Sequence, residues 1–167
     1  MSFATPADLL RRSNADRLLQ LSIPADMGMV SSGALRDAIS GVGLGGYDAD
    51  VRDTINAALE VIDCALGDAT ALISGYGVSQ DASSESLKRI ASTLAMYYLL
   101  GNGRGESDEK EYAATIKLLE SHAKGVINLV PMPVVSGSGS AVVDMSAGNV
   151  VVFSNPSRYS YSGGNDF

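Results

Sequence analysis

The sequence predicts a mainly α-helical protein: a small antiparallel helical bundle with a long central helix, two shorter helices and short N-terminal helices, followed by a C-terminal β-hairpin and an extended tail. Apolar residues recur at spacings of three and four over residues 51–76, as on one stripe of a helix. Aromatic residues make up only 6% of the chain, so small aliphatic side chains must fill the core. After Gly125 the helical spacing gives way to Gly, Ser and Val.

The first element expected is a short helix that begins at Thr5. Thr5 is a suitable N-cap, Pro6 takes the first helical position, and Asp8 falls in the first turn, where the helix dipole favours a negative charge. This helix is expected to run to about Arg12. Three segments complete the N-terminal part: a short helix over 18–21 that ends before Pro24, a loop over 25–32, and one or two helical turns over 34–40.

A glycine run follows at 41–46, and its first, third and sixth positions match the Gly-x-Gly-x-x-Gly pattern of dinucleotide-binding loops. That loop needs a buried strand before it and a phosphate-binding helix directly after it. Here the preceding segment has helical spacing, and residues 47–50 separate the run from the next helix. We therefore interpret the run as a hinge between helices.

The long central helix is expected to begin at Asp48 or Asp50, either of which can cap it. At 1.5 Å per residue the apolar stripe reaches on the order of 36 Å. Gly75 and Gly77 end the helix, and Tyr76 between them is expected to plug the core.

Two shorter helices follow, each bounded by glycine. The first begins at Ser83 or Ser84 and ends at 101–103, with an apolar stripe of Leu87, Ile90, Ala91, Leu94, Ala95 and Tyr98. The second opens at Ser107 and closes at Gly125, with a stripe of Tyr112, Ile116, Leu119 and Ala123. Short connections of this kind place consecutive helices antiparallel.

The C-terminal segment is too poor in apolar residues to form a core of its own. Pro131 and Pro133 block a short β-prone run, and two β-branched runs at 141–145 and 149–153 have the sequence of a hairpin. An isolated two-stranded hairpin is marginally stable at best, so it must dock on something. The domain organisation predicted is a helical body at 1–130, a Pro/Gly/Ser linker at 131–140, and a β-hairpin with an extended arm at 141–167.

The arm has two interpretations. In an isolated monomer we expect disorder, as for most exposed termini. In an assembly we expect the arm to order on a neighbouring chain, with strands added by the valine runs and with aromatic anchors. The candidate residues of this oligomer interface are Val142, Val151, Phe153, Arg158, Tyr159, Tyr161 and Phe167.

The charge limits the function classes. A net charge of −7 and a pI near 4.5 argue against a basic nucleic-acid-binding surface, which needs clustered Lys and Arg. An acidic protein can still lie beside DNA that slides past it without binding. Cys64 is the only cysteine, so an intrachain disulfide scaffold is excluded and a reducing compartment is expected. We recognise no signal peptide and no membrane span.

Few residues are suited to catalysis. His122 is the only histidine, and we interpret it as a solvated or half-buried helix residue, with Cys64 as a buried, inert thiol. Asp53, Glu60 and Asp63 share one face of the central helix. Because the other helices supply no Glu-x-x-His partner, we interpret the three as a solvated or pore-lining acidic face rather than a metal site. No catalytic residue, cofactor or metal ion is expected.

Several short segments resemble the small neck proteins of Mu-like phages and prophages, which are classed as head-tail joining or adaptor proteins. These segments span most of the chain: Phe3–Leu9, Leu18–Ser22, Ala58–Leu66, Leu87–Ala91, Ala95–Leu99, and Val152–Ser154 with Arg158 and Phe167. The resemblance implies a structural virion protein of the neck, assembled in the host cytoplasm and placed at the head-tail junction.

The same resemblance implies a homo-oligomeric ring between the portal protein and the tail or neck proteins, with twelve copies by analogy with other phage connectors. DNA would pass through the ring without specific binding, and the resemblance implies no catalytic residues. Our hypothesis is that Asp53, Glu60 or Asp63 faces this channel. Three alternatives stay open: a tail-completion protein of the same neck, a small metal-dependent carboxylate hydrolase that uses those three acids, and a regulatory helical module that binds a partner helix.

Overall fold

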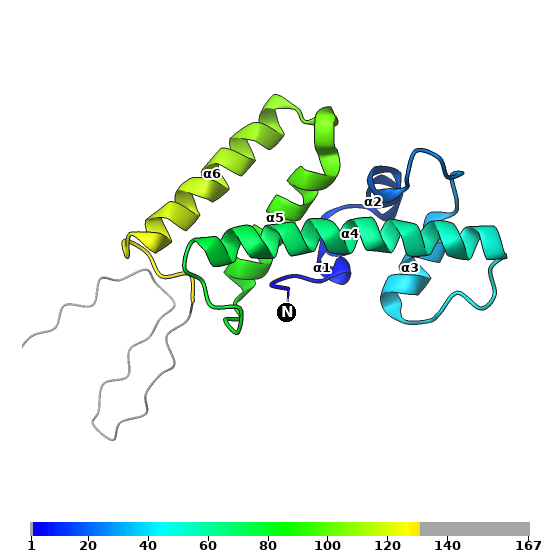
Figure 1. Cartoon of the computed structure of the whole chain (residues 1–167), viewed down its shortest axis with the longest axis horizontal. Coiled ribbons are helices and arrows are strands. Elements are labelled where there is room, and N and C mark those ends of the chain that lie inside the picture. The colour runs from blue at the N-terminus through cyan, green and yellow to red at the C-terminus, as the bar shows by residue number, and fades with distance from the viewer. Residues whose placement is uncertain (1, 131–167) are drawn as a thin grey trace, which may run out of the picture. The chain divides into compact units, whose positions relative to one another are not determined.

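The computed structural model describes residues 2–130, and these residues form helices without any strand (Figure 1). The helices are α1 (Pro6–Arg12), α2 (Ala15–Ser22), α3 (Ser32–Ser40), α4 (Ala49–Gly75), α5 (Glu85–Leu100) and α6 (Glu106–Ala123), with a 3-10 turn at Gly101–Gly103. The predicted mainly helical fold is confirmed. The linker, hairpin and arm predicted at 131–167 lie outside the described residues.

Helix α4 is the central element, as its apolar stripe predicted. It has 27 residues and is therefore about 40 Å long. One face packs against α1, α2, α3 and α5 (Figure 1). The fully buried side chains of that face include Ile55, Ala58, Ile62, Ala69 and Ile73. The helix begins after Asp48, whose side chain makes no capping hydrogen bond, and Tyr76 at its other end is half-buried against the core.

The N-terminal segment is fastened to α4 before α1 begins. The side chain of Phe3 is buried, and its backbone N–H donates to Thr70 Oγ1 of α4 at 3.4 Å. The hydroxyl groups of Ser2 and Thr70 lie 3.0 Å apart. These long-range hydrogen bonds help to fix where the N-terminal helices pack on α4. Local helix propensity alone does not specify that position.

Helix α1 begins with the cap that the sequence predicted. The backbone N–H and the hydroxyl of Thr5 donate to Asp8 Oδ2 at 2.9 and 2.8 Å, and Asp8 N–H donates to Thr5 Oγ1 at 3.3 Å. Burial alone would raise the pKa of Asp8, but these hydrogen bonds, together with the charges of Lys88 and Arg11, outweigh it and hold the pKa below its ordinary value. The ionised carboxylate therefore stabilises the start of α1.

Helices α5 and α6 form a hairpin, and here the structure differs from the predicted bundle. Helix α6 packs closely on α5, whereas α4 and α6 are not a closely packed pair; the other packing partners of α4 are α1, α2 and α3. Leu119 is the one fully buried residue of α6, Tyr112 and Ile116 are half-buried, and Ala123 is exposed. Of the stripe predicted for this helix, Leu119, Tyr112 and Ile116 therefore join the core and Ala123 does not.

Replacing Ile62 by Ala tests the central packing. Ile62 has no exposed surface, so the variant leaves a cavity beneath α4 and should lose about 2–5 kcal/mol of unfolding free energy. The neighbouring residue Asp63 is exposed, and Asp63→Asn is the matched control, expected to change stability by less than about 0.5 kcal/mol. Urea unfolding measures both; equal effects of the two substitutions would contradict the assigned core.

Replacing Asp8 by Ala tests the cap. At pH 7 the variant should lose about 1 kcal/mol of unfolding free energy. The pKa of Asp8 is lower in the folded state, so its contribution is complete above the unfolded-state pKa of about 3.9 and is lost as pH falls through the folded-state value. The gap between variant and wild type in urea unfolding should therefore narrow from pH 7 to pH 3. Asp16→Ala in the first turn of α2 is the control, and a gap that does not vary with pH would refute the assignment.

Candidate functional site

The acidic face of α4 consists of Asp53, Glu60 and Asp63, and all three side chains are exposed. At 100° per residue they lie within about 80° of the helix circumference, opposite the buried stripe. Among residues 2–130 no group of three His, Cys, Asp or Glu side chains is arranged to hold a metal ion. The structure therefore brings these acids together as one solvent-facing row.

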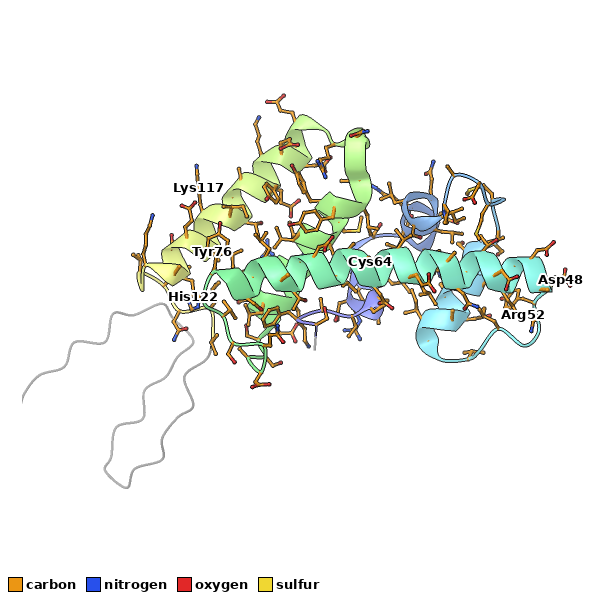
Figure 2. All side chains as sticks on the ribbon, viewed as in Figure 1. Asp48, Arg52, Cys64, Tyr76, Lys117 and His122 are labelled. Atoms are coloured by element: carbon orange, nitrogen blue, oxygen red, sulfur yellow. The ribbon has the colours of Figure 1, made fainter. Side chains whose placement is uncertain are left out.

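Cys64 lies on the same side of α4, midway along the helix (Figure 2). The sequence-based expectation of a buried thiol is wrong, because the Cys64 side chain is exposed. Ile62 is buried, and a residue two positions further along a helix points about 200° away from it. That spacing was the signal that could have placed Cys64 outside the core.

Aromatic and charged side chains join the two helices near the tip of the α5–α6 hairpin. The rings of Tyr97 and Tyr112 stack with centroids 4.0 Å apart, and the Arg104 guanidinium lies 4.1 Å from the Tyr97 ring centroid. Tyr97 Oη donates to the Glu109 carboxylate at 3.0 Å. Burial and this hydrogen bond raise the pKa of Tyr97, so its phenol stays neutral and suits a structural role better than a catalytic one.

A small polar pocket of about 190 Å³ lies where α1 and α2 meet α5 and α6. Arg12 Nη1 donates to the carbonyl oxygen of Arg89 at 2.7 Å and to Thr93 Oγ1 at 3.0 Å. Thr93 in turn donates to Glu111 at 3.3 Å. Arg12 is thus occupied in joining α1 to α5, and the pocket is a polar contact between helices.

An apolar groove of about 320 Å³ runs between α5 and α6. Its floor is formed by Ile90 and Leu129, which are 7% and 8% exposed, and its wall by Leu118, which is 41% exposed. Arg89 and Glu111 also line it. This groove was not predicted from the sequence, although Ala114 and Leu118 are four residues apart and form a second apolar row beside the stripe.

His122 lies near the C-terminal end of α6 (Figure 2). Its side chain is half-buried, and Nδ1 is 3.3 Å from the carbonyl oxygen of Ile127 and 3.4 Å from the backbone nitrogen of Leu129. The imidazole therefore orders the turn that follows α6. Ser84 Oγ, at the start of α5, donates to the carbonyl oxygen of Leu129 at 3.0 Å.

The candidate interface residues of the arm cannot be placed beside these surfaces, because the structure describes the chain only as far as Val130. They are Val142, Val151, Phe153, Arg158, Tyr159, Tyr161 and Phe167, and they stay predictions.

Most of the chain matches a known protein family. The model of the family described as Bacteriophage Mu, Gp36 matches residues 3–141. The chain belongs to the bacteriophage Mu Gp36 family. The match includes all six helices of the described residues and ends where the predicted arm begins. Membership supports a structural or morphogenetic role in a phage. No curated protein matches the chain.

Among the described residues no helix has the length and apolar character that crossing a membrane requires.

Proposed function

We propose that the protein is a non-enzymatic head-tail connector subunit of a Mu-like phage. Copies of it, twelve by analogy with other connectors, form a ring between the portal protein and the tail or neck proteins, at the head-tail junction of the virion. Assembly takes place in the host cytoplasm. The observation that carries the proposal is the match of the Mu Gp36 family to the whole helical body.

The acidic face of α4 supports a place beside moving DNA. A long helix that packs on one side and exposes carboxylates on the other suits a channel wall, because like charges repel the DNA phosphates and no counterions are released to favour binding. The net charge of −7 also disfavours binding to the DNA phosphates. In the proposed ring, Asp53, Glu60 and Asp63 face the channel.

The C-terminal arm supports oligomerisation. A hairpin sequence with few apolar residues needs a partner surface, and a ring supplies one on each neighbouring subunit. The interface therefore includes the valine and aromatic residues predicted for the arm.

Electron microscopy of the purified full-length protein, alone and with the portal protein of the same phage, tests the ring. We expect closed rings in which Asp53, Glu60 and Asp63 line the lumen. Neutralising them together as Asp53→Asn, Glu60→Gln and Asp63→Asn should leave the rings intact but lower the yield of infectious particles. The control neutralises three exposed acids outside α4, Asp16, Asp26 and Asp81, as Asp→Asn. A protein that forms no ring with its portal, or a ring with the three α4 acids on its outer rim, would refute the respective part of the proposal.

Deleting residues 154–167 tests the role of the arm. The far-UV circular dichroism of the helices should not change, whereas sedimentation should detect weaker ring assembly, because the aromatic anchors are missing. A chain that keeps a shuffled order of the same fourteen residues, counted from the sequence, serves as the control for length and composition. Loss of helicity on truncation would mean that the arm belongs to the core of its own subunit.

A further inference from the structure

The α5–α6 groove is an apolar surface that the described part of the chain leaves partly uncovered. Leu118 in its wall is 41% exposed, although it lies beside the fully buried Leu119. Ile127, which follows in the turn after α6, is 37% exposed. The groove volume of about 320 Å³ equals that of about ten water molecules at about 30 Å³ each, which is room for a few branched apolar side chains.

The groove offers polar contacts that suit an extended backbone. Ser86 and Thr115 line it together with the apolar residues, and their hydroxyl oxygens can accept hydrogen bonds from peptide N–H groups. An extended segment places alternate side chains on one side, so it can bury apolar groups in the groove while its backbone meets these hydroxyls. The occupant that fits is therefore an apolar extended segment.

The chain itself contains such a segment beyond the described residues. Val150, Val151, Val152 and Phe153 are consecutive and apolar, and no other run of the chain outside residues 2–130 combines three valines with a phenylalanine. The described chain ends at Val130, directly after Leu129 in the groove floor. Val150 follows Val130 by twenty positions, and a fully extended chain of that length spans at most about 72 Å, which exceeds the length of α4.

We infer that the groove between α5 and α6 binds the Val150–Phe153 segment of a neighbouring copy of this chain. The inference rests on the proposed connector function and deepens it, because it names the surface that receives the arm. The hydrogen bond from Ser84 to Leu129 holds the exit of each arm at the groove floor, and Pro131 and Pro133 disfavour a helical return at the residues before them.

Disulfide trapping in the full-length chain tests this inference. Cys64 is first replaced by Ser, which removes the only native thiol. Leu118→Cys in the groove and Val151→Cys in the arm should then give a ladder of covalently linked subunits after mild oxidation, seen on a non-reducing gel. Lys117→Cys with Val151→Cys is the matched control, because Lys117 is exposed and does not line the groove (Figure 2).

Each outcome of the trapping decides a part of the inference. A ladder with Leu118→Cys and little with Lys117→Cys supports the neighbouring copy. A linked monomer of altered mobility means that the arm occupies the groove of its own chain and overturns the exchange between subunits. The absence of any product specific to Leu118→Cys overturns docking in the groove.

A second variant measures the contribution of the groove without a cross-link. Leu118→Asp should raise the protein concentration needed for half-assembly at least tenfold in analytical ultracentrifugation, with the melting temperature of the helical body unchanged. Lys117→Asp should not. If the protein forms rings but no disulfide forms at Leu118→Cys, the connector role stands and docking in the groove is rejected. If the disulfide forms but no rings are seen, docking in the groove stands and the connector role is rejected.

Discussion

The buried stripe of α4 is the contact on which every other described helix depends. Helices α1, α2, α3 and α5 pack directly against α4, and α6 is held through α5. Because Ala58 and Ala69 are small, the helices approach closely around larger anchors such as Ile55, Ile62 and Ile73. Packing on one side leaves the opposite side of α4 free for carboxylates, so the core and the acidic face are two results of one helical period.

Much of this fold follows from local signals. The cap at Thr5 and Asp8, the spacing along α4 and the serine before α5 each have a short-range physical cause, and all three occur in the structure. The choice of which helices pack against α4 does not have a short-range cause. Whether α6 or the N-terminal helices cover α4 depends on long-range contacts such as Phe3 with Thr70, and no spacing within a single helix specifies those.

Of the candidate surfaces, one follows from local spacing and one depends on long-range contacts. The acidic row on α4 could be predicted from spacing alone, and its three residues are exposed together. The groove could not, because it forms only where Ile90 of α5, Leu118 of α6 and Leu129 of the following turn converge. Cys64 is exposed for another reason: the helical phase set by the buried Ile62 outweighs the general tendency of thiols to be buried.

The hydrogen bond between Ser84 and Leu129 affects how a pull on the C-terminus is transmitted to the helices. The end of the described chain is joined to the first turn of α5, and α5 is a direct packing partner of α4. A pull on the C-terminus therefore acts on two attachments of Leu129, one to Ser84 at the start of α5 and one to His122 near the end of α6. Because α5 packs directly on α4, a part of that load reaches the central helix.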